Sequence, residues 1–212
     1  MDPLTRSDDS WPHLFAVEHG PIESPAPPLS TAGEQLERSR PVELLLDHDE
    51  LTRLLSRRAV LDRARALVER LRREPHRRAC WAMVDVDHFR AIVECHGQAA
   101  ADRLLVATAA LLLRRLGHLE APSHLGRLDG DEFAVLLEDR TPRQAWRLLN
   151  HVRKELAALE HHLPGLAPLH ATLSVGIAVL GAGMEVERWH ERAERALCVA
   201  KVAGRNRVEL IV

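Results

Sequence analysis

Four acidic residues, gathered at two places in the sequence, have the types and spacing to do chemistry. Asp85 and Asp87 come at the end of an apolar run, and Asp131 and Glu132 follow the pair Asp129-Gly130. Carboxylate oxygens are the ligands that hard divalent cations such as Mg²⁺ prefer, often together with substrate phosphates. If the two places lie side by side in a sheet, this pattern favours nucleotidyl transfer.

Each of these groups also has an ordinary structural explanation. Acidic residues at strand ends and in turns are usually solvated, so neither acidic pair alone indicates a site. Two cations that could hold phosphates, Lys201 and Arg205, fall at the C-terminal end of an expected helix, where the helix dipole favours cations anyway. The residue types alone therefore leave a solvated surface as an alternative.

Composition excludes several classes of function. The 212 residues carry 29 Lys and Arg against 31 Asp and Glu, so the formal net charge of -2 gives no reason to expect a nucleic-acid partner. Three cysteines without a C-x-x-C pair predict neither a disulfide framework nor a zinc site. The longest apolar run, 104–113, is too short to span a membrane. We expect a cytoplasmic protein with no membrane partner.

The chain divides into three expected parts. Residues 1–30 are rich in proline, serine and acidic groups, so we expect a disordered tail. Residues 31–46 contain several leucines and predict a short helical linker that could serve in dimerisation. Residues 47–212 form the one domain that a chain of this length would contain.

Helical and strand patterns alternate irregularly within residues 47–212. The expected elements are a helix over 57–73, a strand at 78–86, a helix over 99–116, a hairpin with arms near 123–128 and 133–138, a helix from 142 to about 159, a strand at 171–179, a helix over 185–202 and a strand at 207–212. This order predicts an α+β fold with a mixed central β-sheet flanked by helices, and not a doubly wound dinucleotide-binding sheet.

Six short motifs occur in a fixed order along this domain. They are 48–58 (HDELTRLLSRR), 84–90 (VDVDHFR), 97–102 (GQAAAD), 127–133 (RLDGDEF), 173–178 (LSVGIA) and 196–207 (ALCVAKVAGRNR). Together they resemble the motifs of the GGDEF family of diguanylate cyclases over three quarters of the chain. The resemblance implies a nucleotidyl-cyclase fold, similar to the polymerase palm, and the condensation of two GTP molecules into cyclic di-GMP by a homodimer.

The resemblance also implies a metal site and a catalytic acid–base group. Asp85, the backbone carbonyl of Val86 and Asp131 would bind Mg²⁺ or Mn²⁺. Asp131 would in addition assist deprotonation of the attacking hydroxyl, with Glu132 beside it. Arg90 takes the place of a lysine that stabilises the phosphates. It keeps the positive charge, but on a planar guanidinium group instead of an ammonium.

The remaining residues carried over from the family would bind GTP. Lys201 and Arg205 would hold the β- and γ-phosphates, and Gly130 belongs to the signature loop. Asp102 would accept hydrogen bonds from the guanine edge. Val93 stands where the family has an asparagine that reads guanine, and valine offers no hydrogen bond to the base.

Other departures from the family pattern concern the signature and its feedback motif. Asp129 replaces the first signature glycine; it can adopt the turn, but it adds a negative charge near a triphosphate. Gln98 and Ala101 are milder changes that keep a polar group and a small residue. The product-inhibition motif R-x-x-D is absent from 120–123, so feedback by that route is not expected.

Three interpretations follow from this pattern. The leading one is a GTP-dependent diguanylate cyclase, because five charged groups of the family site are retained. The second is a catalytically inactive GGDEF domain that binds nucleotide or another protein as a regulatory module. The third is a cyclase with relaxed purine choice, since Asp102 is present and the guanine-reading asparagine is not. Activation would come through dimerisation or a regulatory protein partner.

Overall fold

A five-stranded mixed sheet forms the centre of the domain, as expected. The computed structural model describes residues 47–74, 76–160 and 169–211, so the tail and linker expected over 1–46 lie outside the described residues. The elements are α2 (Arg57–Arg73), β1 (Ala79–Val86), α3 (Phe89–His96), α4 (Gln98–Leu116), β2 (Ser123–Asp129), β3 (Glu132–Glu138), α5 (Pro142–Ala158), β4 (Leu173–Val179), α6 (Val186–Val202) and β5 (Val208–Ile211).

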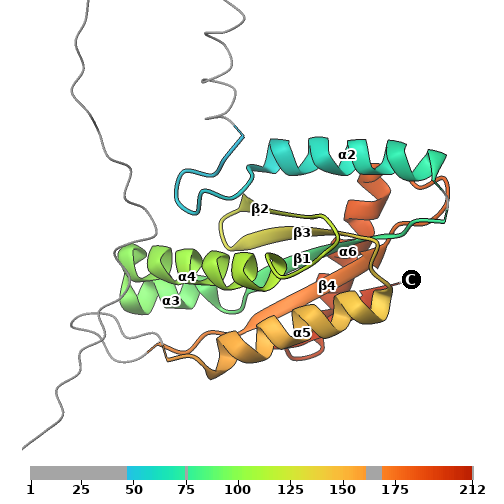
Figure 1. Ribbon diagram of the computed structural model, residues 1–212. Helices are drawn as coiled ribbons and strands as arrows, with labels where there is room; N and C mark the ends of the chain where they lie inside the picture. The colour runs from blue at the N-terminus through green and yellow to red at the C-terminus, as the bar shows by residue number, and fades with distance from the viewer. Residues whose placement is uncertain (1–46, 75, 161–168, 212) are drawn as a thin grey trace, which may run out of the picture. The chain divides into compact units, whose positions relative to one another are not determined.

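The strand order places β1 in the middle of the sheet. The order is β2-β3-β1-β4-β5, in which β1 pairs antiparallel with both β3 and β4, and only β4 and β5 run parallel. The hairpin expected around the Asp-Gly pair is β2 and β3. The tight turn therefore brings the signature segment beside the end of β1 (Figure 1).

Helices cover both faces of the sheet (Figure 1). Alternate residues of β1 separate into two apolar clusters, because successive side chains of a strand point to opposite faces. Cys80, Ala82, Val84 and Val86 join the cluster that contains residues of α4 and α5. Ala79, Trp81 and Met83 join the cluster that contains residues of α2 and α6. All eight residues of β1 are buried.

Helix α6 lies close against β4 because the strand has a glycine at the contact. A Cβ atom at Gly176 would lie 2.0 Å from the backbone nitrogen of Leu197 and 2.4 Å from the carbonyl oxygen of Ala193. Any side chain there would push α6 away from the sheet. This glycine therefore sets the distance between the sheet and the C-terminal end of α6, where Lys201 stands.

Local signals position the helices as the sequence predicts, with one addition. Thr141 and Gln144 form a capping box that starts α5, and Pro142 occupies its first turn. The segment between β1 and α4 contains a further short helix, α3, which the sequence pattern did not predict. Gly97, with φ of 81°, separates α3 from α4. Of the described helices, none has the length and apolar character needed to cross a membrane.

Candidate functional site

Asp85 lies beside Asp131 and Glu132 at the ends of neighbouring strands, which is the condition that the sequence-based hypothesis set. Asp85 of β1 lies directly opposite Glu132 of β3, so both residues belong to the sheet face covered by α2 and α6. The backbone N–H of Val86 donates a hydrogen bond to the carbonyl oxygen of Asp131 at 3.3 Å. The turn after β2 therefore holds its carboxylates next to the last residues of β1.

Burial corrects the sequence-based picture of these carboxylates. Their positions at a strand end and in a turn predict exposed carboxylates, but Asp85 and Asp87 are only 5% and 3% exposed. The reason is that β1 is the central strand and is covered on both faces, whereas the hairpin tip projects beyond it. Asp131 and Glu132 are half-buried, and Asp129 and Gly130 are exposed.

A cation from the far end of the chain closes the acidic cluster. The Nζ atom of Lys201, in the last turn of α6, donates to Oδ2 of Asp85 at 2.6 Å. The Asp85 side chain is almost fully covered, and the Lys201 side chain is 34% exposed. Lys201 is thus more than a helix-end cation in solvent, because it is the direct partner of a buried carboxylate.

The electrostatics of the cluster favour a cation. Burial raises the pKa of Asp85 from its ordinary 3.8 to about 6, and the hydrogen bond from Lys201 opposes this rise. The charges of Asp131 and Glu132 raise the pKa of Asp85 further. Burial also raises the pKa values of Asp131 and Glu132, and Lys201 opposes both shifts. Negative charge is therefore crowded into a partly desolvated space.

Asp87 does not join this cluster, although the sequence groups it with Asp85. Its carboxylate accepts hydrogen bonds from the hydroxyls of Thr172 and Ser174 and from the backbone N–H of Asn206. Sequence reasoning missed this role. The one sequence signal that could have indicated it is the position of Asp87 directly after a buried strand. Its neighbours Thr172, just before β4, and Ser174, within β4, become known only from the sheet pairing.

The residues expected to hold phosphates differ in how they are placed. Arg205 is exposed, has φ of 61° and lies just beyond the C-terminal end of α6. The Arg90 side chain is 93% exposed and pairs with Glu94 one turn along α3, at 3.0 Å. Both arginine side chains are therefore exposed to solvent, whereas the Lys201 side chain is bonded to Asp85.

The two residues expected near the base lie on α3 and α4. Asp102 is half-buried and accepts a hydrogen bond from the side-chain amide of Gln98 at 2.7 Å. Val93 is half-buried and packs against the apolar cluster on the α4 and α5 side of the sheet. The structure contains no base, so the expected contacts of Asp102 and Val93 with guanine stay predictions.

Arg127 links the signature hairpin to the first motif of the domain, a contact that sequence reasoning did not identify. Its Nη1 atom lies 3.2 Å from Oδ1 of Asp49, and its Nε donates to the carbonyl oxygen of Gly130 at 2.8 Å. Asp49 also accepts hydrogen bonds from the backbone and hydroxyl of Thr52. Asp49 and Arg127 both lie within the six motifs, and this was the sequence signal that could have indicated their contact.

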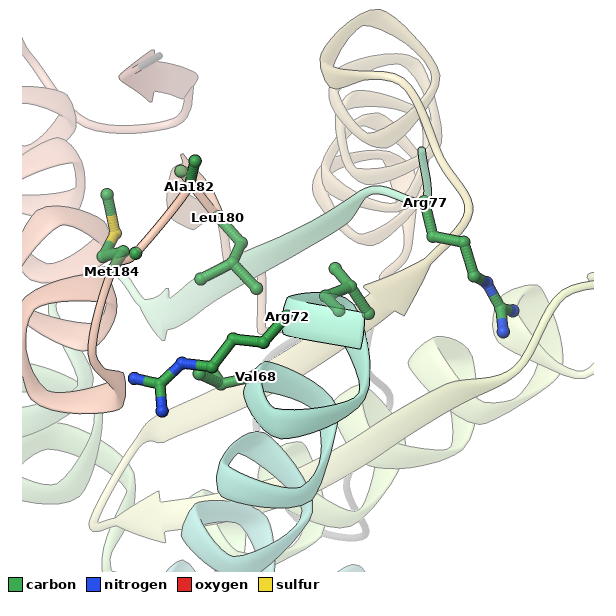
Figure 2. Close-up of a pocket in the computed structure, with 9 residues that line it drawn as sticks. Val68, Arg72, Arg77, Leu180, Ala182 and Met184 are labelled. Carbon is green, nitrogen blue, oxygen red and sulfur yellow. The ribbon is translucent and has the colours of Figure 1, made fainter. Parts of the chain in front are cut away.

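A cavity beside the C-terminal end of α2 lies away from the acidic cluster. It has a volume of about 230 Å³ and is lined by Val68, Leu71, Arg72, Arg77 and residues 180–184. Arg77 precedes β1, so this cavity and Asp85 lie toward opposite ends of that strand. Figure 2 shows the guanidinium of Arg77 directed away from Leu180, and both arginines are already in ion pairs. The cavity therefore contributes nothing to the acidic site.

The chemistry of the acidic cluster fits a hard divalent cation. Within residues 47–74, 76–160 and 169–211, no three Asp, Glu, His or Cys side chains are grouped to hold a metal by themselves. Mg²⁺ usually needs only one or two carboxylates, together with waters and substrate phosphates. Asp85 with Asp131 or Glu132 supplies these hard oxygen ligands, and a cation would relieve the crowding that raises their pKa values.

Comparison with known proteins gives one consistent family. Residues 46–207 match the family described as "Diguanylate cyclase, GGDEF domain". The chain is 36% identical over 151 residues to the diguanylate cyclase DgcP of Pseudomonas aeruginosa, which is 68% of this chain and 22% of that protein. It is 32% identical over 182 residues to the probable diguanylate cyclase DgcC of Escherichia coli, which is 85% of this chain and 47% of that protein. The chain thus spans less than half of either relative.

Solved structures show the same fold. The coiled coil and GGDEF domain of DgcB from Caulobacter crescentus, in complex with c-di-GMP, matches with a TM-score of 0.77 at 24% identity, over 84% of this chain and 93% of that one. The diguanylate cyclase SiaD, in complex with its activator SiaC from Pseudomonas aeruginosa, matches with a TM-score of 0.73 at 30% identity, over 84% of this chain and 68% of that one.

Proposed function

The chain belongs to the GGDEF family of diguanylate cyclases, and from this premise we propose that it condenses two GTP molecules into cyclic di-GMP. The observation that carries the proposal is the cluster at the ends of β1 and the hairpin. There Asp85 lies opposite Glu132 and bonds to Lys201, and Asp131 is held beside Val86. A domain that kept only the fold would have no physical need for this partly buried group of opposite charges.

The proposed reaction forms two phosphodiester bonds. The 3′-hydroxyl oxygen of one GTP attacks the α-phosphorus of the other, the bond to the β-phosphate breaks and pyrophosphate leaves. The same step in the opposite direction closes the ring. The proton of each hydroxyl passes to Asp131, whose raised pKa makes it a stronger base than an ordinary aspartate. Glu132 lies beside it on the face of Asp85.

Mg²⁺ or Mn²⁺ would be held by Asp85, the carbonyl oxygen of Val86 and Asp131. When bound, the ion would neutralise charge on the transferring phosphoryl group. The chain's own cations would act on the rest of the triphosphate. Lys201 would exchange Asp85 for the β-phosphate, Arg205 would reach the γ-phosphate, and Arg90 would supply a further positive charge.

Recognition of the base rests on α3 and α4 in this proposal. Asp102 would accept hydrogen bonds from the guanine edge, exchanging its present bond from Gln98. Val93 would contact the base without a hydrogen bond. Since each subunit offers one nucleotide site and the product joins two nucleotides, the active species would be a homodimer in which two such sites face one another.

Two substitutions support a second candidate, an inactive GGDEF domain that binds nucleotide or a regulatory protein. Asp129 adds a charge that raises the pKa values of Asp131 and Glu132 and would repel a triphosphate. Val93 removes a hydrogen bond to guanine. A cyclase with relaxed purine choice is the third candidate, because Val93 distinguishes the purines less well than asparagine would.

One incubation distinguishes these candidates. The purified chain is mixed with GTP and Mg²⁺, with ATP in a parallel reaction, and the nucleotides are separated by chromatography. We expect cyclic di-GMP and pyrophosphate from GTP alone. Nucleotide binding without product would support the inactive module, and a cyclic product from ATP would support relaxed purine choice.

A further inference from the structure

Asp87 is a buried carboxylate whose hydrogen bonds join three segments of the domain. Its Oδ1 atom accepts from the hydroxyl of Ser174 at 2.6 Å. Its Oδ2 atom accepts from the hydroxyl of Thr172 at 2.6 Å and from the backbone N–H of Asn206 at 3.0 Å. Its own N–H donates to the carbonyl oxygen of Thr172 at 2.9 Å. The carboxylate is thus satisfied by donors, as a buried charge requires.

The segment that Asp87 reaches has an uncommon backbone. Gly204, Arg205 and Asn206 follow one another with φ angles of 113°, 61° and 45°. Residues with a side chain rarely adopt positive φ, and two in succession require outside support. This turn carries Arg205, and it begins three residues after Lys201, which lies in the last turn of α6.

Other contacts hold the same turn at its edges. The backbone N–H of Val175 donates to the carbonyl oxygen of Arg207 at 2.9 Å. Arg153 of α5 donates to the side-chain oxygen of Asn206. The backbone N–H of Arg205 donates to the carbonyl oxygen of Ala200 in α6 at 3.0 Å. Among the described residues 47–74, 76–160 and 169–211, Asp87 is the one side chain that accepts a hydrogen bond from a backbone N–H of residues 204–206. Its loss would therefore change the backbone of the turn as well as a side-chain contact.

The hydrogen bonds of Asp87 also distinguish it from a metal ligand. Both of its oxygens face donors, whereas Asp85 faces other carboxylates and a lysine. Across the described residues 47–74, 76–160 and 169–211, Asp87 takes part in no ion pair. A cation at Asp87 would have to displace the hydroxyls and the amide that now satisfy it.

We propose that Asp87 is a positioning residue that fixes the turn of residues 204–207, so that Arg205 is held ready for the phosphates of the nucleotide. The carboxylate does not touch the substrate; it acts through the backbone of Asn206. This inference rests on the proposed function for the ligand, but the contact between Asp87 and Asn206 can be tested without any nucleotide.

The first arm of the test is amide hydrogen exchange resolved by residue. In the wild-type chain we expect the Asn206 amide to exchange more slowly than an exposed amide. Asp87→Ala removes both acceptor oxygens, whereas an asparagine could still accept from Asn206 through its amide oxygen, so exchange at Asn206 in Asp87→Ala should be at least about tenfold faster. Ser174→Ala, which removes the partner of the other carboxylate oxygen, is the matched control and should leave Asn206 protected.

The second arm measures nucleotide affinity with a GTP analogue whose α,β-bridging oxygen is a methylene, so that no reaction follows. We expect Asp87→Ala to weaken the binding of this triphosphate by about tenfold and to leave GMP binding unchanged, and we expect the same of Arg205→Ala. The double variant should lose little more than either single one, because both changes remove the same contact.

Several outcomes would overturn the proposal. They are an unprotected Asn206 amide in the wild-type chain, unchanged exchange in Asp87→Ala, additive losses in the double variant, or equal loss of GMP affinity. The wild-type measurement decides even if Asp87→Ala fails to fold. Should the wild-type chain bind neither nucleotide, the proposed function fails, and the exchange arm still decides whether Asp87 holds the turn.

Discussion

The Nζ atom of Lys201 lies 2.6 Å from Oδ2 of Asp85, so a cation from the end of α6 neutralises a carboxylate at the end of β1. In the proposed reaction both groups have other partners, a phosphate for Lys201 and a metal for Asp85. The ion pair therefore keeps two reactive charges compensated when no nucleotide is bound. Loading the site would exchange one ion pair for two.

Removing the charge of Asp85 or Asp131 should abolish turnover. Asp85→Asn and Asp131→Asn each take away a hard oxygen ligand of the proposed metal, and Asp131→Asn also removes the base. Cyclic di-GMP formation is measured by chromatography, with Asp62→Asn on the exposed face of α2 as the control. Wild-type rates in both site variants would contradict the assignment.

Asp85→Asn should also stabilise the fold at neutral pH, which differs from the unchanged stability expected of an exposed residue. In the folded chain the pKa of Asp85 is about 6, above the ordinary 3.8. Protonated Asp85 therefore contributes its full stability to the wild-type fold below pH 4, and this contribution is lost as the pH rises through 6 and the carboxyl ionises. A shift of this size corresponds to on the order of 3 kcal/mol at pH 7. Thermal melts should show a higher melting temperature for Asp85→Asn than for the wild type at pH 7 to 8 and no difference at pH 4. An equal increase at both pH values would refute the buried charge of Asp85 as the cause.

Neutralising Asp129 should tighten GTP binding. The residue is exposed on the hairpin and its charge raises the pKa values of Asp131 and Glu132. Asp129→Asn keeps the shape of the turn and removes the repulsion, so the KM for GTP with Mg²⁺ should fall by about three- to tenfold at low salt. The gain should shrink at high salt. A gain independent of salt would point to turn geometry instead, and Asp129→Gly would test that.

Val93→Asn should lower the KM for GTP by about tenfold, which corresponds to about 1.4 kcal/mol. The side chain is half-buried against the apolar cluster, so the amide has an open side on which to meet the base. Val93→Ala removes the packing without adding a donor and serves as the control. A lowered melting temperature with no change in KM would mean that position 93 faces the core, with an amide buried unpaired.

Activity should depend on protein concentration. One subunit binds one GTP in the proposed mechanism, so specific activity should rise until the dimer is saturated. Light scattering at each concentration gives the fraction of dimer to which the rate is compared. A constant specific activity from a species shown to be a monomer would exclude the two-site mechanism.

The regular elements of this domain could be read from the sequence because their signals are local. The stripe of apolar residues predicts α2, the Thr141-Pro142 pair starts α5, and the Asp-Gly pair turns the hairpin. Helix α3 was missed because eight residues are too few for a helical period to stand out. The residues proposed to act on GTP were found the same way, as short motifs of contiguous residues.

Only the tertiary structure decided how those residues relate to one another. Asp85 and Lys201 are 116 positions apart, and Asp87 and Asn206 are 119 apart, so no local pattern connects them. The strand order brings each pair together, and coverage of the central strand on both faces buries the two aspartates. Residue type and spacing determine which groups are available; charge compensation, burial and pKa depend on neighbours that only the packed sheet supplies.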